Sequence, residues 1–177
     1  MCEVQVAHTA ELDAATRQLA LDLLYDVFEG DMTAHDWEHA LGGMHALAWD
    51  DGRLVGHASV IQRRLMHGGR AWRTGYVEAV GVVSGFRRRG VGGAMMAPLE
   101  RVIRDAYDLG ALGASDMARK FYAARGWEPW RGATSALTPD GIRRTEAEDD
   151  CIYVLPVSAP LDLAGTLTCD WRDGDVW

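Results

Sequence analysis

The residues with the clearest chemical potential form a basic, glycine-rich segment that runs from Tyr76 to Gly93. Its valine-rich first half favours an extended chain, and apolar positions with helical spacing begin at Val91. The glycines before and after Val91 therefore lie at a predicted helix N-terminus, where backbone N–H groups lack intrahelical partners and the helix dipole favours negative charge. The predicted anion-binding residues are Arg87, Arg88, Arg89, Gly90, Val91, Gly92 and Gly93.

Two common phosphate-binding patterns do not fit this segment. A Walker A loop requires lysine and a hydroxyl residue where this chain has Val91 and Gly92. A dinucleotide fingerprint that starts at Gly90 requires a third glycine where the chain has Met95. The pattern that remains is Arg87-x-x-Gly90-x-Gly92, and a glycine-rich turn with solvated arginines is its structural alternative.

Two titratable side chains, Glu78 within this segment and Tyr122 farther along the chain, also matter to the argument. Glu78 lies in the middle of the predicted strand, and period-two spacing predicts that Tyr76 and Val80 share its face of the sheet. The alternative for Glu78 is a solvated glutamate on an open sheet face. Tyr122 lies on a predicted helix after Ser115, where spacings of three and four residues also suit a packing tyrosine.

The elements around these residues alternate between strands and helices in a mixed α/β order. Strands are predicted over residues 4–8, 44–49, 54–65, 72–83, 111–114, 127–130, 135–137 and 151–155. Helices are predicted over residues 12–28, after a Thr33–Asp36 capping pair, from Val91 onward with a kink at Pro98, and from a Ser115 or Asp116 cap to Gly126. The strands over residues 44–83 are expected to form an antiparallel meander.

Bulk properties predict one domain over residues 1–177 and exclude several classes of protein. The formal net charge of -8 argues against a nucleic-acid partner and is compatible with a cationic small molecule. Three widely spaced cysteines indicate neither a disulfide framework nor a cysteine zinc site. The sequence has no long apolar run and no export signal, so we expect a cytoplasmic protein without a membrane anchor.

The turn Arg87-x-x-Gly90-x-Gly92 resembles the pyrophosphate-binding turn of the GCN5-related N-acetyltransferases (GNAT). The whole chain is similar to the aminoglycoside 2'-N-acetyltransferases of that superfamily. The segments that carry the resemblance are Phe28-x-Gly30-Asp31, Asp36–His39, Leu41–His45, Ile61–Arg63, Gly75–Glu78, Ser115 with Tyr122, Gly126-Trp127 and Cys169–Trp177. The resemblance implies the GNAT α/β (α+β) fold, with a mixed central sheet flanked by helices.

The resemblance also implies transfer of an acetyl group from acetyl-CoA to the 2' amine of an aminoglycoside, with antibiotic resistance as the result. The attacking amine must be neutral, so a carboxylate has to accept its proton. The family match makes Glu78 that base, through water, and Tyr122 the donor to the departing thiolate. The implied coenzyme A contacts beyond the phosphate turn are Val80, Gly81, Val82 and Ser115.

A substrate with several ammonium groups is expected to be recognised by carboxylates. The candidates implied by the resemblance are Asp31, Asp36, Glu78, Glu148, Asp149, Asp175 and the terminal carboxylate of Trp177. Asp36 and Asp175 rank first, although Asp31 and Asp36 also suit helix caps. The acidic loop over residues 146–150 is a region where such proteins differ, so drug preference stays open. The resemblance further implies a homodimer.

Three alternatives remain at this point. His35 and His39 match the zinc-peptidase pattern H-x-x-E-H, but that mechanism needs a third ligand and a longer helix, so no metal is expected. The same phosphate turn would also serve acetylation of another polyamine, aminosugar or peptide amine. The third alternative is a non-catalytic acyl-CoA-binding module, against which the presence of Glu78 and Tyr122 argues.

Overall fold

The predicted alternation of strands and helices is present in the computed structural model, which describes residues 2–177. The chain forms two units, one of Met1–Ile61 with Val77–Val102 and the other of Gln62–Tyr76 with Ile103–Trp177. Strands β3 (Arg53–His67) and β4 (Arg70–Val82) and helix α3 (Val91–Ala106) each contribute residues to both units. Within residues 2–177, no helix combines the length and apolar character that crossing a membrane requires.

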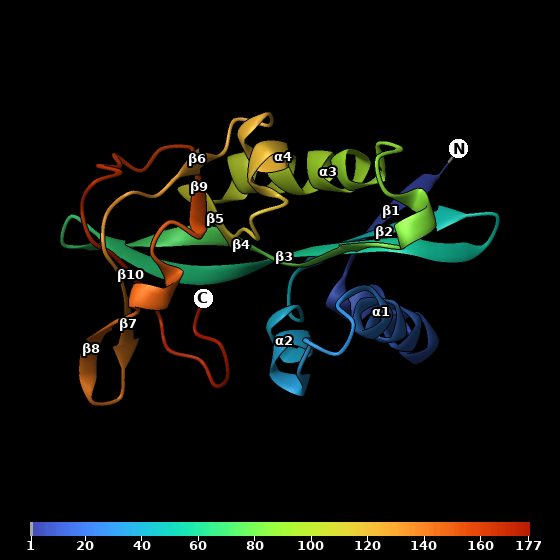
Figure 1. Ribbon diagram of the computed structural model, residues 1–177, viewed down its shortest axis with the longest axis horizontal. Helices are drawn as coiled ribbons and strands as arrows, with labels where there is room; N and C mark the ends of the chain where they lie inside the picture. Colours follow the sequence, from blue (N-terminus) through green and yellow to red (C-terminus); the bar gives the residue numbers. More distant parts are fainter. Residues whose placement is uncertain (1) are drawn as a thin grey trace. The chain divides into compact units, whose positions relative to one another are not determined.

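The first unit is a layered arrangement of helices on strands. Strand β2 (Met44–Asp50) pairs antiparallel with β1 (Glu3–His8) and with β3, which confirms the antiparallel pairing expected for the first two meander strands. Figure 1 shows α1 (Ala14–Val27) and α2 (Ala34–His39) on one face of these strands and α3 on the opposite face. Short 3-10 turns at Thr9–Glu11 and Ser84–Phe86 complete the unit.

Helix α1 packs directly on the end of β4. It begins after Asp13, whose carboxylate accepts a hydrogen bond of 2.7 Å from the Thr16 N–H, as expected for a helix cap. Its buried side chains include Leu23 and Leu24, which face the sheet. A Cβ atom added to Gly81 would lie 3.1 Å from Leu24 Cδ2, so glycine at this position permits the close approach of the helix.

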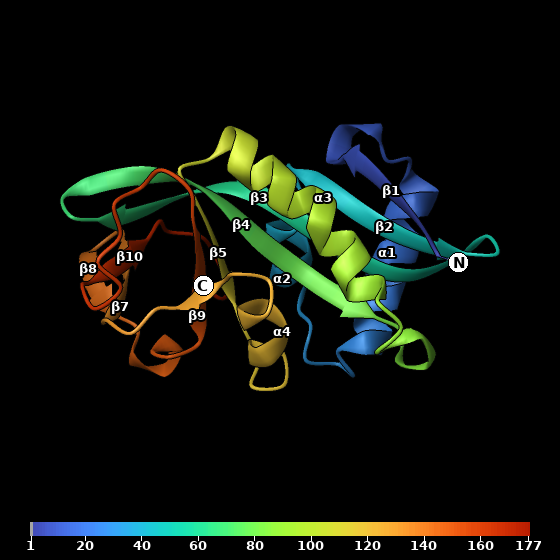
Figure 2. The same cartoon turned by 90° about the horizontal axis from the view of Figure 1, so that it is seen from above.

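Helix α3 covers the other face, where it lies across β3 and β4 (Figure 2). An added Cβ atom at Gly56 in β3 would lie 2.9 Å from the Met95 sulfur. Val91, Met95, Met96 and Leu99 are all buried, as the helical spacing of these apolar residues predicts. Val91, the first residue of α3, is therefore held in place by packing against the sheet.

The second unit contains the remaining strands of a mixed sheet. Its elements are β5 (Leu109–Gly113), α4 (Arg119–Ala123), β6 (Glu128–Pro129), β7 (Thr134–Thr138), β8 (Gly141–Arg144), a 3-10 turn at Glu146–Glu148, β9 (Ile152–Pro156) and β10 (Leu167–Cys169). The strand order is β6-β9-β5-β4-β3-β10-β7-β8, with β4–β5 and β7–β10 parallel and β5–β9 antiparallel. The mixed α/β (α+β) class is therefore confirmed.

Four local features differ from the sequence-based expectation. The strands β8 and β10 were not predicted, and the helix cap at Ser115 or Asp116 is wrong. The N-cap of α4 is Ala118, while the Ser115 carbonyl accepts from the Ala118 N–H and Asp116 forms an ion pair of 2.8 Å with Arg119. The helix ends at Ala123, three residues before the predicted Gly126, which has the left-handed φ of 89° typical of a glycine after a helix.

A β-bulge in β4 changes which residues share a face. Ala79 has a φ of 50°, which breaks the regular alternation of side chains. Gly75 faces Ile103 of α3, whereas Gly81, an even number of residues later, faces α1. Ala79 packs with the α1 cluster, so it lies on the same face as Glu78. Val80 points to the opposite face, and the prediction that it shares a face with Glu78 is wrong.

Candidate active site

The turn between β4 and α3 has the geometry of an anion-binding loop. Arg88 and Gly90 adopt left-handed backbone conformations, with φ values of 60° and 84°. Helix α3 begins directly afterwards, and the Ala94 N–H donates to the Gly90 carbonyl at 2.9 Å. The N–H groups of Val91, Gly92 and Gly93 precede this bond in the first helical turn, where backbone donors are left for a ligand.

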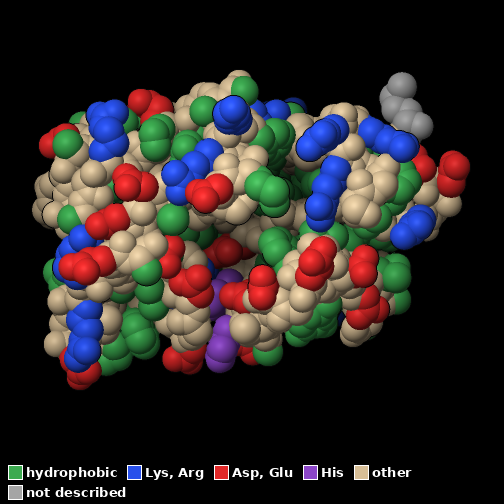
Figure 3. Space-filling view, in the orientation of Figure 1, with side chains coloured by type: hydrophobic (Ala, Val, Ile, Leu, Met, Phe, Trp, Pro, Cys, Tyr) green, Lys and Arg blue, Asp and Glu red, His purple; other side chains and the backbone are tan. Residues whose placement is uncertain are grey.

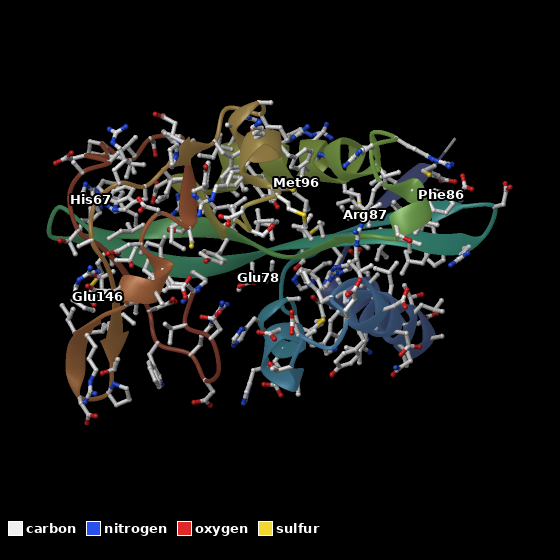
Figure 4. The ribbon with its side chains drawn as sticks, viewed as in Figure 1. His67, Glu78, Phe86, Arg87, Met96 and Glu146 are labelled. Carbon is white, nitrogen blue, oxygen red and sulfur yellow. The ribbon has the colours of Figure 1, made fainter. Side chains whose placement is uncertain are left out.

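The three arginines of the turn are exposed and close to this helix end. Figure 3 shows Lys and Arg side chains gathered over this part of the first unit, at the upper right of the view. Arg87 donates from Nε to the Val82 carbonyl at 3.0 Å, and the Arg89 guanidinium carbon lies 5.5 Å from the centre of the Phe86 ring. Figure 4 labels Phe86 and Arg87 in this segment. The arginines therefore add positive charge and also brace the turn.

Strand β4 continues past its pairing with β5. Within residues 2–177 the β4–β5 register runs from Thr74 opposite Leu109 to Tyr76 opposite Ala111, whereas β4 extends to Val82. A strand edge of this kind can pair with an added extended chain through backbone hydrogen bonds. The predicted contacts Val80, Gly81 and Val82 lie in this part of β4.

Glu78 lies in the middle of β4 (Figure 4), and the next residue in the chain is the bulged Ala79. Its side chain is partly exposed, and its backbone carbonyl accepts a hydrogen bond of 3.4 Å from the Ser59 hydroxyl. Gly75 faces α3, so regular alternation over the three residues to Glu78 puts this side chain on the opposite face, that of α1 and α2. Asp31 and Asp36 belong to the same unit as Glu78.

The carboxylate of Asp36 already serves a structural role. It accepts hydrogen bonds from the Thr33 N–H at 2.7 Å and the Thr33 hydroxyl at 2.8 Å, which forms the capping box at the start of α2. Asp31 is exposed, and its N–H donates to the Phe28 carbonyl at 2.9 Å after the end of α1. Asp36 thus has the capping role that the sequence offered as its alternative, whereas Asp31 caps neither helix, because the caps are Phe28 for α1 and Thr33 for α2.

The histidine pair on α2 shows no zinc-site geometry. The rings of His35 and His39 are stacked with their centroids 6.4 Å apart, and His35 Nδ1 lies 3.4 Å from Glu38 Oε2. Over residues 2–177, no group of three or more His, Cys, Asp or Glu side chains is arranged to hold a metal ion.

Tyr122 and Ser115 belong to the second unit. Tyr122 is 5% exposed, and its ring packs edge-on against Phe121 and Trp127 at centroid distances of 5.1 and 6.1 Å. These contacts fix the ring position, so Tyr122 has a packing role in addition to any chemical one. Ser115 is exposed at the start of the α4 segment.

The C-terminal tail is held firmly by two arginines, a role that the sequence did not predict. Arg63 donates to the Val176 carbonyl at 2.7 Å and forms an ion pair of 2.8 Å with Asp170. Arg172 donates to a carboxylate oxygen of Trp177 at 2.7 Å. No local signal in the sequence indicates the Arg63–Asp170 link, because 107 positions separate the two residues.

Trp177 and Asp175 are positioned by this anchored tail. The Trp177 indole N–H donates to the Thr145 hydroxyl at 2.8 Å, and the Trp177 backbone N–H donates to Asp175 Oδ1 at 3.1 Å. The Trp177 side chain is buried, while Asp175 is exposed. The tail therefore presents the exposed Asp175 carboxylate on a fixed backbone. A terminus without such contacts is usually poorly ordered.

The two acids of the 146–150 loop differ in their surroundings. Burial and the negative charge of Asp175 raise the pKa of Glu148 above its usual value. Asp149 instead accepts hydrogen bonds from Arg144 and from the Thr134 N–H and hydroxyl, which hold its pKa well below the usual range. Glu148 and Asp175 repel each other, so a cation bound beside them would be favourable. The Asp149 carboxylate is instead already bound by Thr134 and Arg144.

Comparisons with known proteins agree with this description. A family model described as an acetyltransferase (GNAT) domain matches residues 9–130. An aminoglycoside 2'-N-acetyltransferase from Mycolicibacterium fortuitum is 51% identical over 98% of this chain and 91% of its own length. The region matched by the family model includes the phosphate turn, Glu78 and Tyr122.

Solved structures share the fold at low sequence identity. Escherichia coli ElaA matches with a TM-score of 0.60 and 22% identity, over 88% of this chain and 99% of that protein. An acyl-CoA N-acyltransferase from Pseudomonas aeruginosa matches with a TM-score of 0.62 and 16% identity, also over 88% of this chain and 99% of that protein.

Proposed function

The chain belongs to the GNAT acetyltransferase family, and we propose that it transfers the acetyl group of acetyl-CoA to the 2' amine of aminoglycoside antibiotics, which confers resistance to them. The observation that carries this proposal is the 51% identity with the Mycolicibacterium fortuitum aminoglycoside 2'-N-acetyltransferase across 98% of the chain.

The residues of the β4–α3 region fit acetyl-CoA. The pyrophosphate suits the N–H groups of Val91, Gly92 and Gly93, with positive charge from the turn arginines. The pantetheine amide groups suit the β4 edge at Val80, Gly81 and Val82, and we assign Ser115 a further polar contact. When bound, acetyl-CoA supplies the thioester carbonyl that the amine attacks and the thiolate that departs.

In the proposed mechanism, two residues of this chain handle protons. The Glu78 carboxylate accepts a proton from the substrate ammonium, through water, so that a neutral amine is present for attack. Tyr122 donates its hydroxyl proton to the departing thiolate. The packing of Tyr122 against Phe121 and Trp127 supports this role, because a donor must be held in one orientation.

Carboxylates recognise the ammonium groups of the substrate in this proposal. Glu148 and Asp175 have the strongest support, since burial and the repulsion between them make a cation favourable beside Glu148. The Trp177 carboxylate already accepts a hydrogen bond from Arg172. Asp31, Asp36 and Asp149 are weaker candidates. Asp36 and Asp149 each already accept hydrogen bonds from neighbouring protein groups.

We propose that residues 1–177 act as a single acetyltransferase domain, because β3, β4 and α3 each supply both units. We also propose a homodimer in the cytoplasm. The resemblance of the sequence to the aminoglycoside 2'-N-acetyltransferases supports the homodimer, and three cysteines without a disulfide pattern suit a reducing cytoplasm.

Coenzyme A release with a panel of aminoglycosides tests the proposed function. Turnover is expected with drugs that carry a 2' amine and not with matched drugs that carry a 2' hydroxyl. Turnover with unrelated polyamines or peptides alone would instead identify a different amine substrate. Binding of acetyl-CoA without turnover on any amine would indicate a non-catalytic module.

Neutralising the tail carboxylate is expected to weaken drug binding. Asp175→Asn keeps the oxygen that accepts from the Trp177 N–H but removes the negative charge. A hydrogen bond to a charged group contributes roughly 1.5 to 3 kcal/mol, so the aminoglycoside KM should rise about 10- to 100-fold. The KM for acetyl-CoA and the Tm should stay near those of the wild type.

Further variants of this chain test whether the effect on drug KM is specific to the C-terminal tail. Asp140→Asn removes the same charge from the exposed turn between β7 and β8 and should leave the drug KM unchanged. A C-terminal extension removes the Trp177 carboxylate and should raise KM, whereas the same extension at the N-terminus should not. Unchanged drug kinetics for both Asp175→Asn and the C-terminal extension would exclude the tail from the substrate site.

The raised pKa of Glu148 predicts a link between pH and drug binding. Folding favours the protonated side chain, so its charged form costs stability as pH rises through the raised pKa. Only the charged form attracts ammonium, and the drug KM should therefore rise as pH falls, starting above the usual titration range of glutamate. Glu148→Gln should raise both Tm and drug KM at neutral pH and flatten the KM–pH profile.

The control for this prediction is the acetyl-CoA KM, which should show the same pH dependence in both proteins. A Glu148→Gln enzyme that keeps the wild-type drug KM and its pH dependence would show that Glu148 does not contact the substrate.

A further inference from the structure

A chain of buried hydrogen bonds ends beside Glu78 in the first unit. His57 Nδ1 lies 2.9 Å from the Ala79 carbonyl, and His57 Nε2 lies 2.9 Å from His45 Nδ1. His45 Nε2 lies 2.7 Å from the Thr9 hydroxyl, which accepts from the Gly42 N–H at 2.8 Å and has the Gly43 carbonyl as a second, longer acceptor for its single proton at 3.2 Å. Both imidazoles are fully buried. The chain thus connects the β-bulge to the loop between α2 and β2.

The Ala79 end of this chain dictates the direction of every bond. A carbonyl only accepts, so His57 Nδ1 must carry the proton. In the neutral ring His57 Nε2 is then an acceptor, which requires a proton on His45 Nδ1, and His45 Nε2 in turn accepts from Thr9. Burial lowers the pKa of His45 to about 3 and that of His57 to about 4, so both rings are neutral near pH 7.

The bulge is a strained place that requires such support. Ala79 has a Cβ atom and yet adopts a φ of 50°, a conformation that residues other than glycine rarely hold without help from their surroundings. Two side chains of β3 on the same face, His57 and Ser59, contact the consecutive carbonyls of Ala79 and Glu78. The direction of the Glu78 side chain depends on this local backbone.

We propose that His57 is a positioning residue that holds the bulged carbonyl of Ala79 and thereby aims the carboxylate of Glu78, with His45 and Thr9 fixing its tautomer. The proposal rests on the role of Glu78 in the proposed function. His57 acts through Ala79 and contacts no reacting atom. The Trp37 ring, with its centroid 6.0 Å from that of His57, packs against this imidazole.

The test compares His57→Asn with His57→Leu. The two new side chains have nearly the same shape, and both lose the contact with His45. Only asparagine places an N–H donor where His57 Nδ1 donates to Ala79. A misplacement on the order of 1 Å can cost about 100-fold in rate. For His57→Leu we therefore expect a kcat reduced by about 10- to 100-fold with little change in acetyl-CoA KM, and for His57→Asn a kcat close to that of the wild type.

Equal kcat values for the two variants would overturn the positioning role. Nitrogen NMR of the wild-type histidine rings gives a second measurement that does not require either variant to fold. A protonated Nδ1 on both His45 and His57 is expected at neutral pH, and a protonated Nε2 on His57 would overturn the proposal. Failure of the proposed function would be visible separately, as a wild-type protein that binds acetyl-CoA but releases no coenzyme A with any aminoglycoside.

Discussion

Replacing Glu78 with glutamine is expected to lower kcat by about 100- to 10,000-fold near neutral pH, the usual cost of losing a general base. Glutamine preserves the size of the side chain and its polar character but cannot accept the ammonium proton. The rate deficit should narrow as pH rises, because free amine then accumulates without help from the enzyme. Steady-state kinetics from neutral to alkaline pH measures both effects.

The control for this prediction is Glu128→Gln, which neutralises an exposed glutamate on β6 and should leave kcat unchanged. The affinity of the Glu78→Gln enzyme for acetyl-CoA should remain close to that of the wild type, since the phosphate turn is intact. Turnover close to that of the wild type would make Glu78 a binding or packing residue.

Coupling between Glu78 and His57 follows from the same geometry. If His57 acts only by aiming the carboxylate, its removal should matter little once that carboxylate is gone. The kcat of the double variant Glu78→Gln, His57→Leu should therefore resemble that of Glu78→Gln alone, which is the non-additivity expected of residues that act together.

The regular elements were predictable because their signals are local. The apolar spacing in α1 and α3 and the β-branched residues of β3 and β4 predicted their type and approximate bounds. Strands β8 and β10 lack such a signal. Gly141–Arg144 is exposed throughout, and Leu167–Cys169 is only three residues long and gains its register from β3 and β7.

The bulge at Ala79 was not predictable from the sequence, and it altered the interpretation of the neighbouring residues. Alanine gives no indication of a positive φ, and the His57 side chain that contacts the Ala79 carbonyl lies 22 positions away in the sequence. A strict period of two therefore assigned Val80 to the wrong face. Residue types predicted an acid on a strand before a phosphate turn, but they could not predict how the backbone aims it.

The roles of the candidate substrate acids were also only partly predictable from the sequence. The sequence identifies carboxylates that could bind a cation, but only the structure reveals which of them already accept hydrogen bonds from other protein groups. Asp149 is bound by Thr134 and Arg144, whereas the electrostatic repulsion between Glu148 and Asp175 has no counterpart in the sequence pattern. Contacts between residues far apart in the sequence, such as that of Arg63 with Val176, fix the position of acids such as Asp175.

Gly92→Asp is expected to reduce acetyl-CoA affinity by at least about 100-fold. Gly92 lies in the first turn of α3, where its N–H precedes the first intrahelical bond from Ala94. An aspartate there brings a negative charge to the point where the pyrophosphate would bind, and its side chain competes for the same donors. Losing two hydrogen bonds to a charged group, at roughly 1.5 to 3 kcal/mol each, accounts for the expected loss. Isothermal titration calorimetry measures it directly.

Gly92→Asp is expected to lower acetyl-CoA affinity without lowering the stability of the fold, so a loss of affinity could not be attributed to unfolding. Glycine in a helix costs about 0.5 to 1 kcal/mol relative to alanine, and an acid near a helix N-terminus stabilises the helix by about 0.3 to 1 kcal/mol. The Tm of Gly92→Asp should therefore equal or exceed that of the wild type while affinity falls. Gly92→Ala shares the backbone effect without the charge and should keep an affinity within a few-fold of wild type. If Gly92→Asp binds acetyl-CoA as tightly as Gly92→Ala does, the N-terminus of α3 is not the pyrophosphate site.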